Sequence, residues 1–323
     1  MTNLLELKNV SKTFSLGGII RKKRVIAVDN FSLEIPEDQQ KIITLAGESG
    51  SGKTTISNLI LGFIKPTSGE IIYRGKNLWK LKRHEWKRYR REVQAVFQDP
   101  YESFNSFYKM EHSLITPIKK FKLAKTEGEA VKIASEALWS VGLNADEILN
   151  KRPHELSGGQ RQRVMLARVF ALRPKILLAD EPVSMIDVSL RADILKIIQR
   201  LQKEFGMSCI YITHDLSNAF CISNYIIILY LASVMEEGDF QDIIKTPKHP
   251  YVKMLIDSIP KPDPKNRWDG KVKLQDIEVA RLEKILGCKF SNRCLQAKEV
   301  CHEKNPNLVN LGDNRKIRCY EYA

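Results

Sequence analysis

The chain has 323 residues, of which 43% are hydrophobic and 28% charged, an ordinary composition for a globular protein of two or three folding units. It begins without a basic stretch followed by an apolar one, and its longest apolar run, residues 225–232, is far shorter than the roughly 20 residues of a membrane-spanning helix. We therefore expect a soluble, intracellular protein. The net charge of +14 suits three kinds of partner: a nucleic acid, an anionic membrane surface or an acidic protein.

The first 46 residues predict a small β-subdomain followed by a buried strand. Apolar and polar residues alternate weakly, which predicts three short strands over residues 4–10, 25–28 and 31–35, with a basic, glycine-containing loop at 17–24. Residues 41–46 are rich in β-branched side chains and are typical of a buried strand. Antiparallel strands ahead of this buried strand indicate a β-subdomain attached to a separate core.

A glycine-rich loop follows that buried strand. Residues 47–54 fit the pattern G-x-x-x-x-G-K-[ST], and residues 55–61, closed by Gly62, predict a helix. In this context backbone N–H groups turn toward phosphate oxygens and the helix N-terminus adds positive potential. Lys53 would contact the β- and γ-phosphates, and the Thr54 hydroxyl would ligate Mg²⁺. We expect a nucleoside triphosphate to bind here, through Gly47, Glu48, Ser49, Gly50, Ser51, Gly52, Lys53, Thr54 and Thr55.

Beyond this helix the sequence becomes strongly basic. Residues 68–75 predict a turn and a strand, and the densest cluster of basic residues lies within residues 74–91. Trp79, Trp86 and Tyr89 occur in this cluster at roughly helical spacing, so we expect them to pack inward rather than to stack on bases. The cluster is therefore interpreted as a solvated face.

The middle of the chain predicts a strand and then a helical region. Residues 93–97 are typical of a buried strand that ends at Gln98, and the composition from there to about residue 156 is helical. Thr126 and Glu129 form a capping-box pattern, which predicts a helix that runs to residue 141.

A second capping box opens the next helix. Ser157 and Gln160 have the required spacing, and the helix is expected to end before Pro174. Gly158 and Gly159 lie in its first turn, where glycines cost about 1 kcal/mol each. Such a helix start lets a ligand approach the backbone closely. Because the N–H groups and the helix dipole point outward, we expect that ligand to be an anion.

Two carboxylates follow the next predicted strand. Residues 176–180 form an apolar run that ends in Asp180 and Glu181, at the strand end where α/β proteins bind ligands. Asp180 suits a Mg²⁺ ligand, and Glu181 could orient or deprotonate an attacking water. A further strand, residues 209–213, delivers His214 to the same edge, where it could contact a γ-phosphate.

Together these motifs resemble the ATP-binding cassette family over residues 4–245. The run Leu-Ser-Gly-Gly-Gln at residues 156–160 matches the family's signature, which few other P-loop families carry. The resemblance implies an A-loop aromatic at Phe14, a Q-loop residue at Gln98, a Walker B aspartate at Asp180, a catalytic glutamate at Glu181, a switch histidine at His214 and a D-loop at residues 184–187. It also implies a catalytic role for Lys53 and a Mg²⁺ site formed by Thr54, Gln98 and Asp180.

In this family two cassettes pair head to tail, with ATP between the P-loop of one and the signature of the other. The resemblance therefore implies that four signature residues serve an ATP bound to a partner chain: Ser157, Gly158, Gly159 and Gln160. The D-loop reads Ser184-Met185-Ile186-Asp187, where the family usually has Ser-Ala-Leu-Asp.

The rest of the chain resembles the oligopeptide/dipeptide importer branch of the family. This resemblance is carried by Pro-Lys-His-Pro-Tyr at residues 247–251 and by Gly-Cys-Lys-Phe-Ser-Asn-Arg-Cys at residues 287–294. Prolines at positions 260, 262 and 264 predict a stiff linker that leads into a C-terminal appendage.

The appendage contains four of the six cysteines, in the spacing C-x5-C-x6-C-x17-C: Cys288, Cys294, Cys301 and Cys319. The paired C-x2-C of most zinc ribbons is absent from this pattern. Four thiolates in a cytosolic protein suggest a metal site, and the resemblance implies a 4Fe–4S cluster, with Zn²⁺ as the alternative. Incidental burial of the four cysteines is the third reading. Cys209 and Cys221 lie in apolar stretches and are expected in the core.

The predicted fold class is α/β: a P-loop NTPase core with a mostly parallel sheet, an antiparallel β-subdomain, a helical subdomain and a small cysteine-containing appendage. We expect the nucleotide-binding domain at residues 1–245, its helical subdomain at about 99–170, and the appendage at 246–323.

The resemblance implies an ATPase that powers solute import at the cytoplasmic face of the membrane, with a di- or oligopeptide as the expected cargo and an oligosaccharide as the alternative. The implied partners are a second ATPase subunit, expected to be a non-identical sister, two transmembrane permease subunits and an extracellular substrate-binding protein, with no nucleic acid. The competing hypothesis is a non-transport cassette ATPase that acts on nucleic acid or ribosomes. Such proteins usually carry two cassettes or a long coiled coil, whereas this sequence has one cassette and no sustained heptads.

Overall fold

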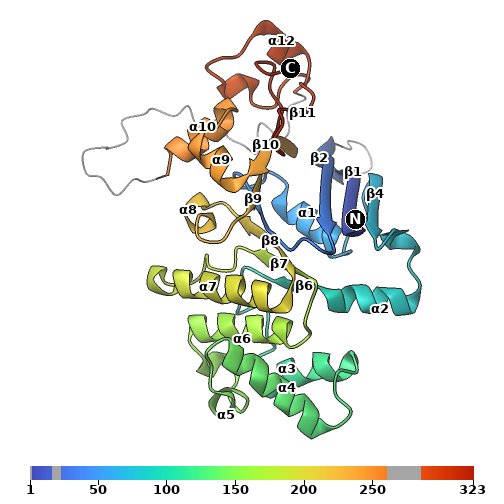
Figure 1. The fold of residues 1–323 in the computed structure, drawn as a ribbon, viewed down its shortest axis with the longest axis vertical. Helices are drawn as coiled ribbons and strands as arrows, with labels where there is room; N and C mark the ends of the chain where they lie inside the picture. The colour runs from blue at the N-terminus through green and yellow to red at the C-terminus, as the bar shows by residue number, and fades with distance from the viewer. Residues whose placement is uncertain (1, 17–22, 260–284) are drawn as a thin grey trace. The chain divides into compact units, whose positions relative to one another are not determined.

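The structure is a computed structural model that describes residues 2–16, 23–259 and 285–323 (Figure 1). The chain divides into two compact units. Unit 1 comprises Met1–Pro36, Ile43–Trp79 and Thr213–Ala323, and unit 2 comprises Glu37–Ile42 and Lys80–Ile212. The expected proline linker at 260–264 and the centre of the expected loop at 17–24 lie outside the described residues.

Unit 1 contains both ends of the chain and most of its strands. Its strands are β1 (Asn3–Leu16), β2 (Lys23–Pro36), β3 (Ile42–Ala46), β4 (Ser68–Tyr73), β5 (Lys76–Asn77), β9 (Tyr225–Tyr230), β10 (Ser233–Asp239), β11 (Val309–Asn310) and β12 (Lys316–Ile317). Its helices are α1 (Lys53–Ile60), η1 (Leu78–Lys80), α8 (Leu216–Ala219), α9 (Phe240–Lys245), α10 (Pro250–Asp257), η3 (Ser291–Arg293) and α12 (Glu299–Glu303).

The antiparallel β-subdomain is confirmed as a four-stranded sheet in the order β2-β1-β4-β5. The prediction of two separate strands at 25–28 and 31–35 was wrong, because both stretches belong to the single strand β2. The expected first strand, residues 4–10, likewise extends to Leu16.

A β-bulge explains why β2 reads as two strands in the sequence. Val10 pairs with Phe31 while Lys12 pairs with Val28, so two residues of β2 face one residue of β1. Asn30, inside this bulge, has a φ of 49°, a left-handed conformation that asparagine tolerates better than most residues. The break in the hydrophobic pattern therefore marks a bend within one strand.

The second sheet of unit 1 has the order β11-β12-β10-β9-β3. β3 is parallel to β9, with Leu45 opposite Ile227, and all five β3 residues are buried. The expected strand, glycine loop and helix around the P-loop are confirmed as β3, residues 47–52 and α1.

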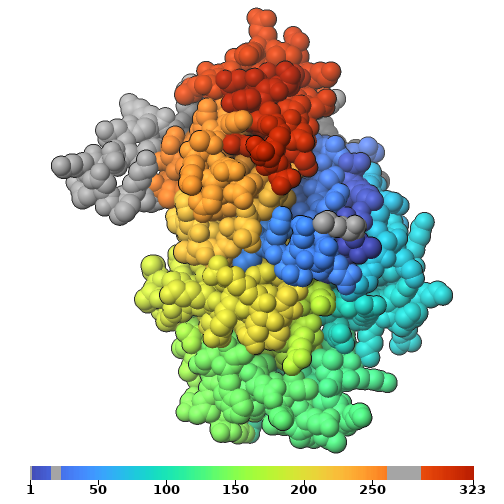
Figure 2. Space-filling model, in the orientation of Figure 1, coloured from blue at the N-terminus to red at the C-terminus, as the bar shows by residue number. Residues whose placement is uncertain are grey.

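The C-terminal segment extends this sheet. β12 pairs with β10, with Ile317 opposite Glu236, and β11 pairs with β12. Figure 2 shows the red C-terminal residues packed beside the orange α9 and α10. The cysteine-containing region therefore shares the sheet that carries the P-loop strand.

Unit 2 contains a parallel sheet and a set of helices. Its strands are β6 (Val93–Val96), β7 (Ile176–Asp180) and β8 (Ser208–Thr213), in the order β8-β7-β6. Its helices are α2 (Arg83–Glu92), α3 (Met110–Lys120), α4 (Glu127–Ser140), α5 (Ala145–Ile148), η2 (Pro153–Glu155), α6 (Gly158–Phe170) and α7 (Val188–Phe205). All β8 residues and the first four of β7 are buried, as their apolar runs predict.

Local predictions in unit 2 are confirmed with small changes. Thr126 caps α4 by accepting a hydrogen bond from the Glu129 N–H at 3.2 Å, but the Glu129 carboxylate bonds the N–H of Lys125 rather than that of Thr126. α6 ends at Phe170, before Pro174 as expected. Of the three aromatic residues predicted to pack inward from the basic cluster, Tyr89 is buried, whereas Trp79 and Trp86 are only half-buried.

The two cysteines outside the appendage differ from each other. Cys209 is fully buried in β8, and burial raises the pKa of its thiol to about 12. Cys221 is exposed just beyond α8, so its predicted place in the core was wrong. In the part of the chain that the structure describes, no helix combines the length and apolar character required to cross a bilayer.

Candidate functional site

Lys53 closes the P-loop on itself. Its ammonium donates hydrogen bonds to the carbonyl oxygens of Gly47 at 2.7 Å and Glu48 at 2.9 Å, and lies 3.4 Å from the Ser51 hydroxyl. The Ser51 N–H also donates to the Glu48 carbonyl, and the Ser51 carbonyl accepts from Ala232. The loop is therefore held in one curved conformation by bonds within unit 1.

Two P-loop glycines are required by the surrounding backbone. Gly52 has a φ of 110°, and a Cβ atom there would lie 2.4 Å from the Ala27 carbonyl oxygen. Gly47 has a φ of 148°, and its Cβ would lie 2.2 Å from the Leu229 carbonyl oxygen. Both conformations exclude side chains. The pattern thus selects glycine at positions where β2 and β9 approach the loop.

Helix α1 begins directly after this loop without a side-chain cap. Gly52 is its N-cap residue, and no acidic side chain lies in its first turn. The first N–H groups of a helix lack partners within the helix, and its dipole favours an anion at this end. Phosphate groups are the ligands that this arrangement binds in P-loop proteins.

The remaining predicted residues of unit 1 lie at the surface. His214 is exposed at the end of β8, whereas the neighbouring Asp215 caps α8 by accepting a hydrogen bond from the Ser217 N–H at 2.9 Å. Asp215 therefore has a structural task. Phe14, on β1, is 38% exposed, and the Lys12 ammonium lies 5.2 Å from its ring centroid.

Unit 2 brings Gln98 and Glu181 together. The Gln98 amide donates to a Glu181 carboxylate oxygen at 3.1 Å. Glu181 has a φ of 46°, a conformation that is costly for a non-glycine residue. Its N–H donates to the Ile212 carbonyl at 2.9 Å, and its carbonyl accepts from Ser184. The strained turn after β7 thus aims the glutamate toward the Q-loop residue, with Asp180 one position before it.

The signature residues open α6 as expected. The Ser157 hydroxyl accepts from the Gln160 N–H at 3.2 Å, and the Gln160 side chain accepts from the Ser157 N–H at 3.0 Å. A Cβ on Gly158 would meet only the Tyr101 hydroxyl, at 3.9 Å, whereas one on Gly159 would meet Leu190 at 3.1 Å. Among the residues that the structure describes, none lies close enough to require a glycine at Gly158.

Sequence reasoning missed the neighbours of this helix start. The Arg161 guanidinium donates two hydrogen bonds to the Leu156 carbonyl and lies 3.8 Å from the ring centroid of Tyr101. In the D-loop, Met185 is 56% exposed while Ile186 is buried. No spacing rule links Tyr101 to Arg161, because their contact depends on how the chain returns after α3 to α5.

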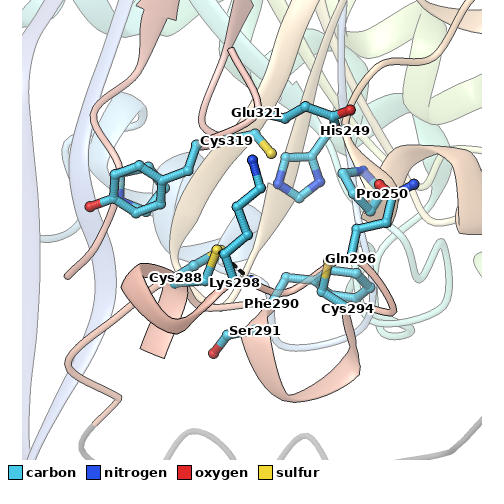
Figure 3. Close-up of a pocket in the computed structure, with 13 residues that line it drawn as sticks. His249, Pro250, Cys288, Phe290, Ser291, Cys294, Gln296, Lys298, Cys319 and Glu321 are labelled. Carbon is cyan, nitrogen blue, oxygen red and sulfur yellow. Dashed lines mark hydrogen bonds between the residues drawn. The ribbon is translucent and has the colours of Figure 1, made fainter. Parts of the chain in front are cut away.

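The four C-terminal cysteines line one cavity of about 220 Å³ in unit 1, together with His249 and Phe290. Figure 3 shows Cys288, Cys294 and Cys319 entering it from different sides. Such a volume exceeds several-fold what one water molecule needs. Among the described residues, no three His, Cys, Asp or Glu side chains converge closely enough to hold a metal ion.

Burial shapes the acid–base properties of this cavity. It raises the pKa of the Cys288 thiol to about 11, and it raises the pKa values of Cys294 and Cys319. Burial also lowers the pKa of His249 to about 4. Each shift disfavours the charged form, so thiolates would form here only with compensation by positive charge. Bound metal supplies such charge.

Two further residues of the C-terminal part contact the P-loop and were not predicted. The Arg293 guanidinium bonds the Glu48 carboxylate, and the Tyr251 hydroxyl accepts from the Glu48 N–H. Both residues lie within the stretches that resemble the importer branch, but spacing alone gives no signal of this contact.

Comparison with known proteins places these motifs in one family. Residues 28–184 match the ABC transporter family, and residues 235–301 match the oligopeptide/dipeptide transporter C-terminal region. The oligopeptide transport ATP-binding protein OppF of Haemophilus influenzae is 35% identical over 85% of this chain and 83% of its own length. The chain belongs to the ABC transporter family, in its oligopeptide/dipeptide branch. It is accordingly an ATPase.

Other comparisons agree with the family. A Bacillus subtilis relative, YkfD, is 36% identical over 99% of this chain and 95% of its own length. A dimeric structure of the ATP-binding cassette MJ0796, in a post-hydrolysis state with ADP and Pi, is 32% identical with a TM-score of 0.64, and covers 73% of this chain and 98% of that one. The α/β cassette fold predicted from the sequence is thus confirmed.

Proposed function

We propose that this chain is the ATPase subunit that drives import of a peptide through separate membrane subunits. One observation carries the proposal: a complete set of cassette motifs occurs in one chain with the C-terminal region of oligopeptide/dipeptide transporters. Relatives in Haemophilus influenzae and Salmonella typhimurium are named as oligopeptide transport ATP-binding proteins. Nothing comparable favours the nucleic-acid or ribosome alternative.

The proposed nucleotide chemistry assigns one task to each motif. The P-loop and Lys53 hold the phosphates of ATP, with Phe14 against the adenine, while Thr54, Gln98 and Asp180 hold Mg²⁺. Mg²⁺ when bound neutralises charge on the β- and γ-oxygens.

Glu181 orients and deprotonates the attacking water. Its hydrogen bond with Gln98 and its strained turn support this role, because both restrict where the carboxylate points. His214 contacts the γ-phosphate.

The signature helix is proposed to serve ATP on a partner cassette, expected to be a non-identical sister subunit. The open space at Gly158 supports this, because, apart from its neighbours in the chain, no described residue except Tyr101 lies within 4 Å of the position that a Cβ atom would take. We propose further that two permease subunits and an extracellular binding protein complete the importer, with the chain at the cytoplasmic face of the membrane. The basic surface around α2 suits docking beside anionic lipid.

The cysteine cavity is proposed to hold a 4Fe–4S cluster. Its volume and the four thiols on its wall support a cluster, because a single Zn²⁺ needs four ligands that converge within about 2.3 Å of one point. A bound cluster would cross-link the four cysteines and so stabilise the C-terminal segment, which has few buried apolar residues.

Replacement of Glu181 tests the catalytic assignment. In the assembled importer, Glu181→Gln should retain ATP binding but hydrolyse ATP at least about a hundred-fold more slowly, because it removes the general base. Glu204→Gln, at an exposed position of α7, is the matched control and should keep the normal rate. Normal turnover by Glu181→Gln would show that the assignment is wrong.

Replacement of Cys294 tests the metal assignment. Anaerobically purified protein should contain iron and sulfide and show a brown charge-transfer band, and Cys294→Ser should lose most of both. Cys221→Ser, which alters an exposed cysteine outside the cavity, should keep them. Stoichiometric zinc in colourless protein would reject the cluster, and four freely reactive thiols without metal would reject any metal site.

A further inference from the structure

Glu48, the second residue of the P-loop, is held by side chains that lie more than 200 residues further along the chain. Its carboxylate accepts two hydrogen bonds from Arg293, from Nη1 to Oε2 at 3.0 Å and from Nη2 to Oε1 at 3.2 Å. Its backbone N–H donates to the Tyr251 hydroxyl at 3.2 Å. Bidentate pairing of this kind fixes both the position and the plane of a carboxylate.

The ion pair is sheltered from solvent, and aromatic rings lie beside the guanidinium. The Arg293 side chain is 7% exposed and that of Glu48 is 20% exposed. The guanidinium lies 5.5 Å from the ring centroid of Tyr230 and 5.7 Å from that of Phe290, and Nη1 also donates to the Tyr230 hydroxyl. Water and salt therefore screen this pair less than a surface pair, which typically contributes little.

The location of Glu48 makes this pairing important for a phosphate ligand. The Glu48 carbonyl accepts from the Lys53 ammonium, so movement of residue 48 would also displace the lysine that binds phosphate. An unpaired carboxylate in the same loop would repel a triphosphate, because like charges in a partly buried site raise each other's free energy. Arg293 counters both effects.

We propose that Arg293 is a positioning residue for ATP binding: it neutralises and orients Glu48, so that the C-terminal region completes the P-loop. The inference rests on the proposed role of residues 47–54 in binding ATP. The C-terminal region would then contribute directly to nucleotide affinity through Arg293, the residue that precedes Cys294.

Equilibrium binding of MgATP to the full-length chain tests the proposal. Arg293→Met, which keeps an unbranched apolar stem and removes the charged guanidinium, should weaken binding about ten-fold or more. Arg293→Lys should lose less, since it keeps the charge but not the paired geometry. In the assembled importer the loss should appear in KM, while kcat at saturating ATP stays within two-fold of wild type.

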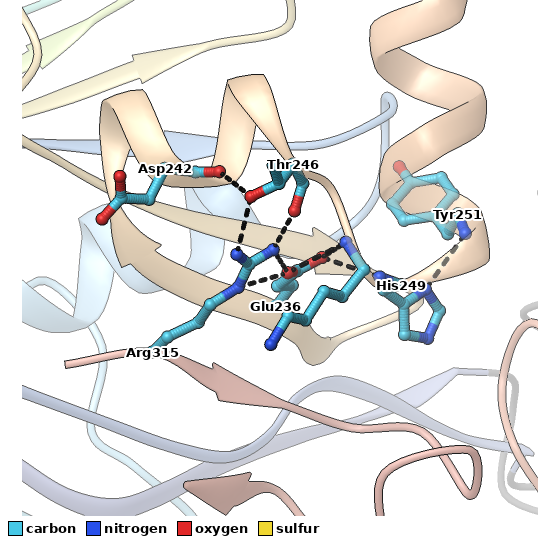
Figure 4. Close-up of polar contacts among 7 residues, drawn as sticks. Glu236, Asp242, Thr246, His249, Tyr251 and Arg315 are labelled. Atoms are coloured by element: carbon cyan, nitrogen blue, oxygen red, sulfur yellow. Dashed lines mark hydrogen bonds and ion pairs between the residues drawn. The ribbon is translucent and has the colours of Figure 1, made fainter. Parts of the chain in front are cut away.

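Arg315→Met is the matched control for general loosening of the same segment. Figure 4 shows the Arg315 guanidinium bonded to the Glu236 carboxylate, which also accepts from the backbone N–H groups of Lys248 and His249. Arg315 is nearly as buried as Arg293, with side-chain exposures of 10% and 7%, and Glu236 is fully buried. The bonds of Arg315 go to β10 and to Thr246 just after α9 rather than to the P-loop. We expect Arg315→Met to lower thermal stability and to leave MgATP affinity unchanged.

A double-mutant cycle separates neutralisation of Glu48 from simple packing. If Arg293 acts through Glu48, the loss caused by Arg293→Met should shrink to less than two-fold in a Glu48→Gln background. Wild-type affinity in Arg293→Met, an equal loss in Arg315→Met, or full additivity in the cycle would each overturn the inference. Failure of the wild-type chain to bind MgATP would instead overturn the proposed function.

Discussion

The starts of α1 and α6 both contain glycines next to a predicted phosphate, yet they are built in opposite ways. At α1, Gly52 is the N-cap, no side chain caps the helix, and the Ala27 carbonyl fills the space where a Cβ would lie. At α6, Ser157 and Gln160 cap each other, and the space beside Gly158 is open except for the Tyr101 hydroxyl.

This difference indicates where each ligand must come from. The α1 glycines are required by this chain's own backbone, so they would be needed even to form the loop. Gly158 has no such requirement and costs helix stability. The open space beside Gly158 would admit a group from outside the chain, and this supports the proposed binding of an ATP held by a partner cassette.

The largest effect is expected from Gly52→Ala. The change combines a left-handed φ of 110° with a contact of 2.4 Å to the Ala27 carbonyl, which together cost about 2–6 kcal/mol. The loop should therefore lose its conformation, with no measurable MgATP binding and a melting temperature lowered by several degrees.

Gly206→Ala is the control for left-handed strain without a clash. Gly206 ends α7 with a φ of 57°, and a Cβ there would meet nothing within 4 Å. It should lower stability by about 1–2 kcal/mol and leave ATP binding intact. If Gly52→Ala binds MgATP as Gly206→Ala does, the α1 glycine is not required in the way we describe.

A smaller but more selective effect is expected from Gly158→Ala. Alanine favours a helix over glycine by up to about 1 kcal/mol, and the added methyl makes only an ordinary contact with Tyr101. The variant should melt at the same or a higher temperature and bind MgATP normally. Because the methyl would occupy the space that we propose for a phosphate on the partner cassette, ATP hydrolysis by the assembled pair should fall about a hundred-fold.

Weaker MgATP binding by the Gly158→Ala chain itself would remove the distinction between the two helix starts. Normal hydrolysis by the assembled pair would also remove this distinction, because the open space beside Gly158 would then have no function in catalysis.

The sequence predicted those parts of the fold that depend on local patterns. β3, β7 and β8 are apolar runs, and the Ser157 cap depends on residues three positions apart, so spacing was sufficient. The sequence predicted two strands where β2 is continuous, because the bulge at Asn30 interrupts the hydrophobic pattern just as a loop would. Cys221 was wrongly predicted to be in the core, because a short apolar stretch does not indicate which of its side chains face the core.

The contacts around the candidate site depend on long-range geometry, which spacing does not encode. Arg293 and Glu48 are 245 positions apart, and Tyr101 contacts Arg161 only after the chain has passed through α3, α4, α5 and η2. Motifs therefore identified the residues expected to touch ATP, whereas the residues that hold those motifs in place required the structure.

The smallest effect is expected from Ser157→Ala, which tests whether the cap of α6 has a second task. Loss of the hydroxyl that accepts from Gln160 should lower stability by about 1 kcal/mol. Thr126→Ala removes an equivalent cap from α4 and should cost the same in denaturant unfolding. Only Ser157→Ala should also slow hydrolysis by the assembled pair, because the proposed partner phosphate lies at that helix start alone. Equal slowing by Thr126→Ala would trace the loss to stability, and the Ser157 hydroxyl would then have no role beyond capping α6.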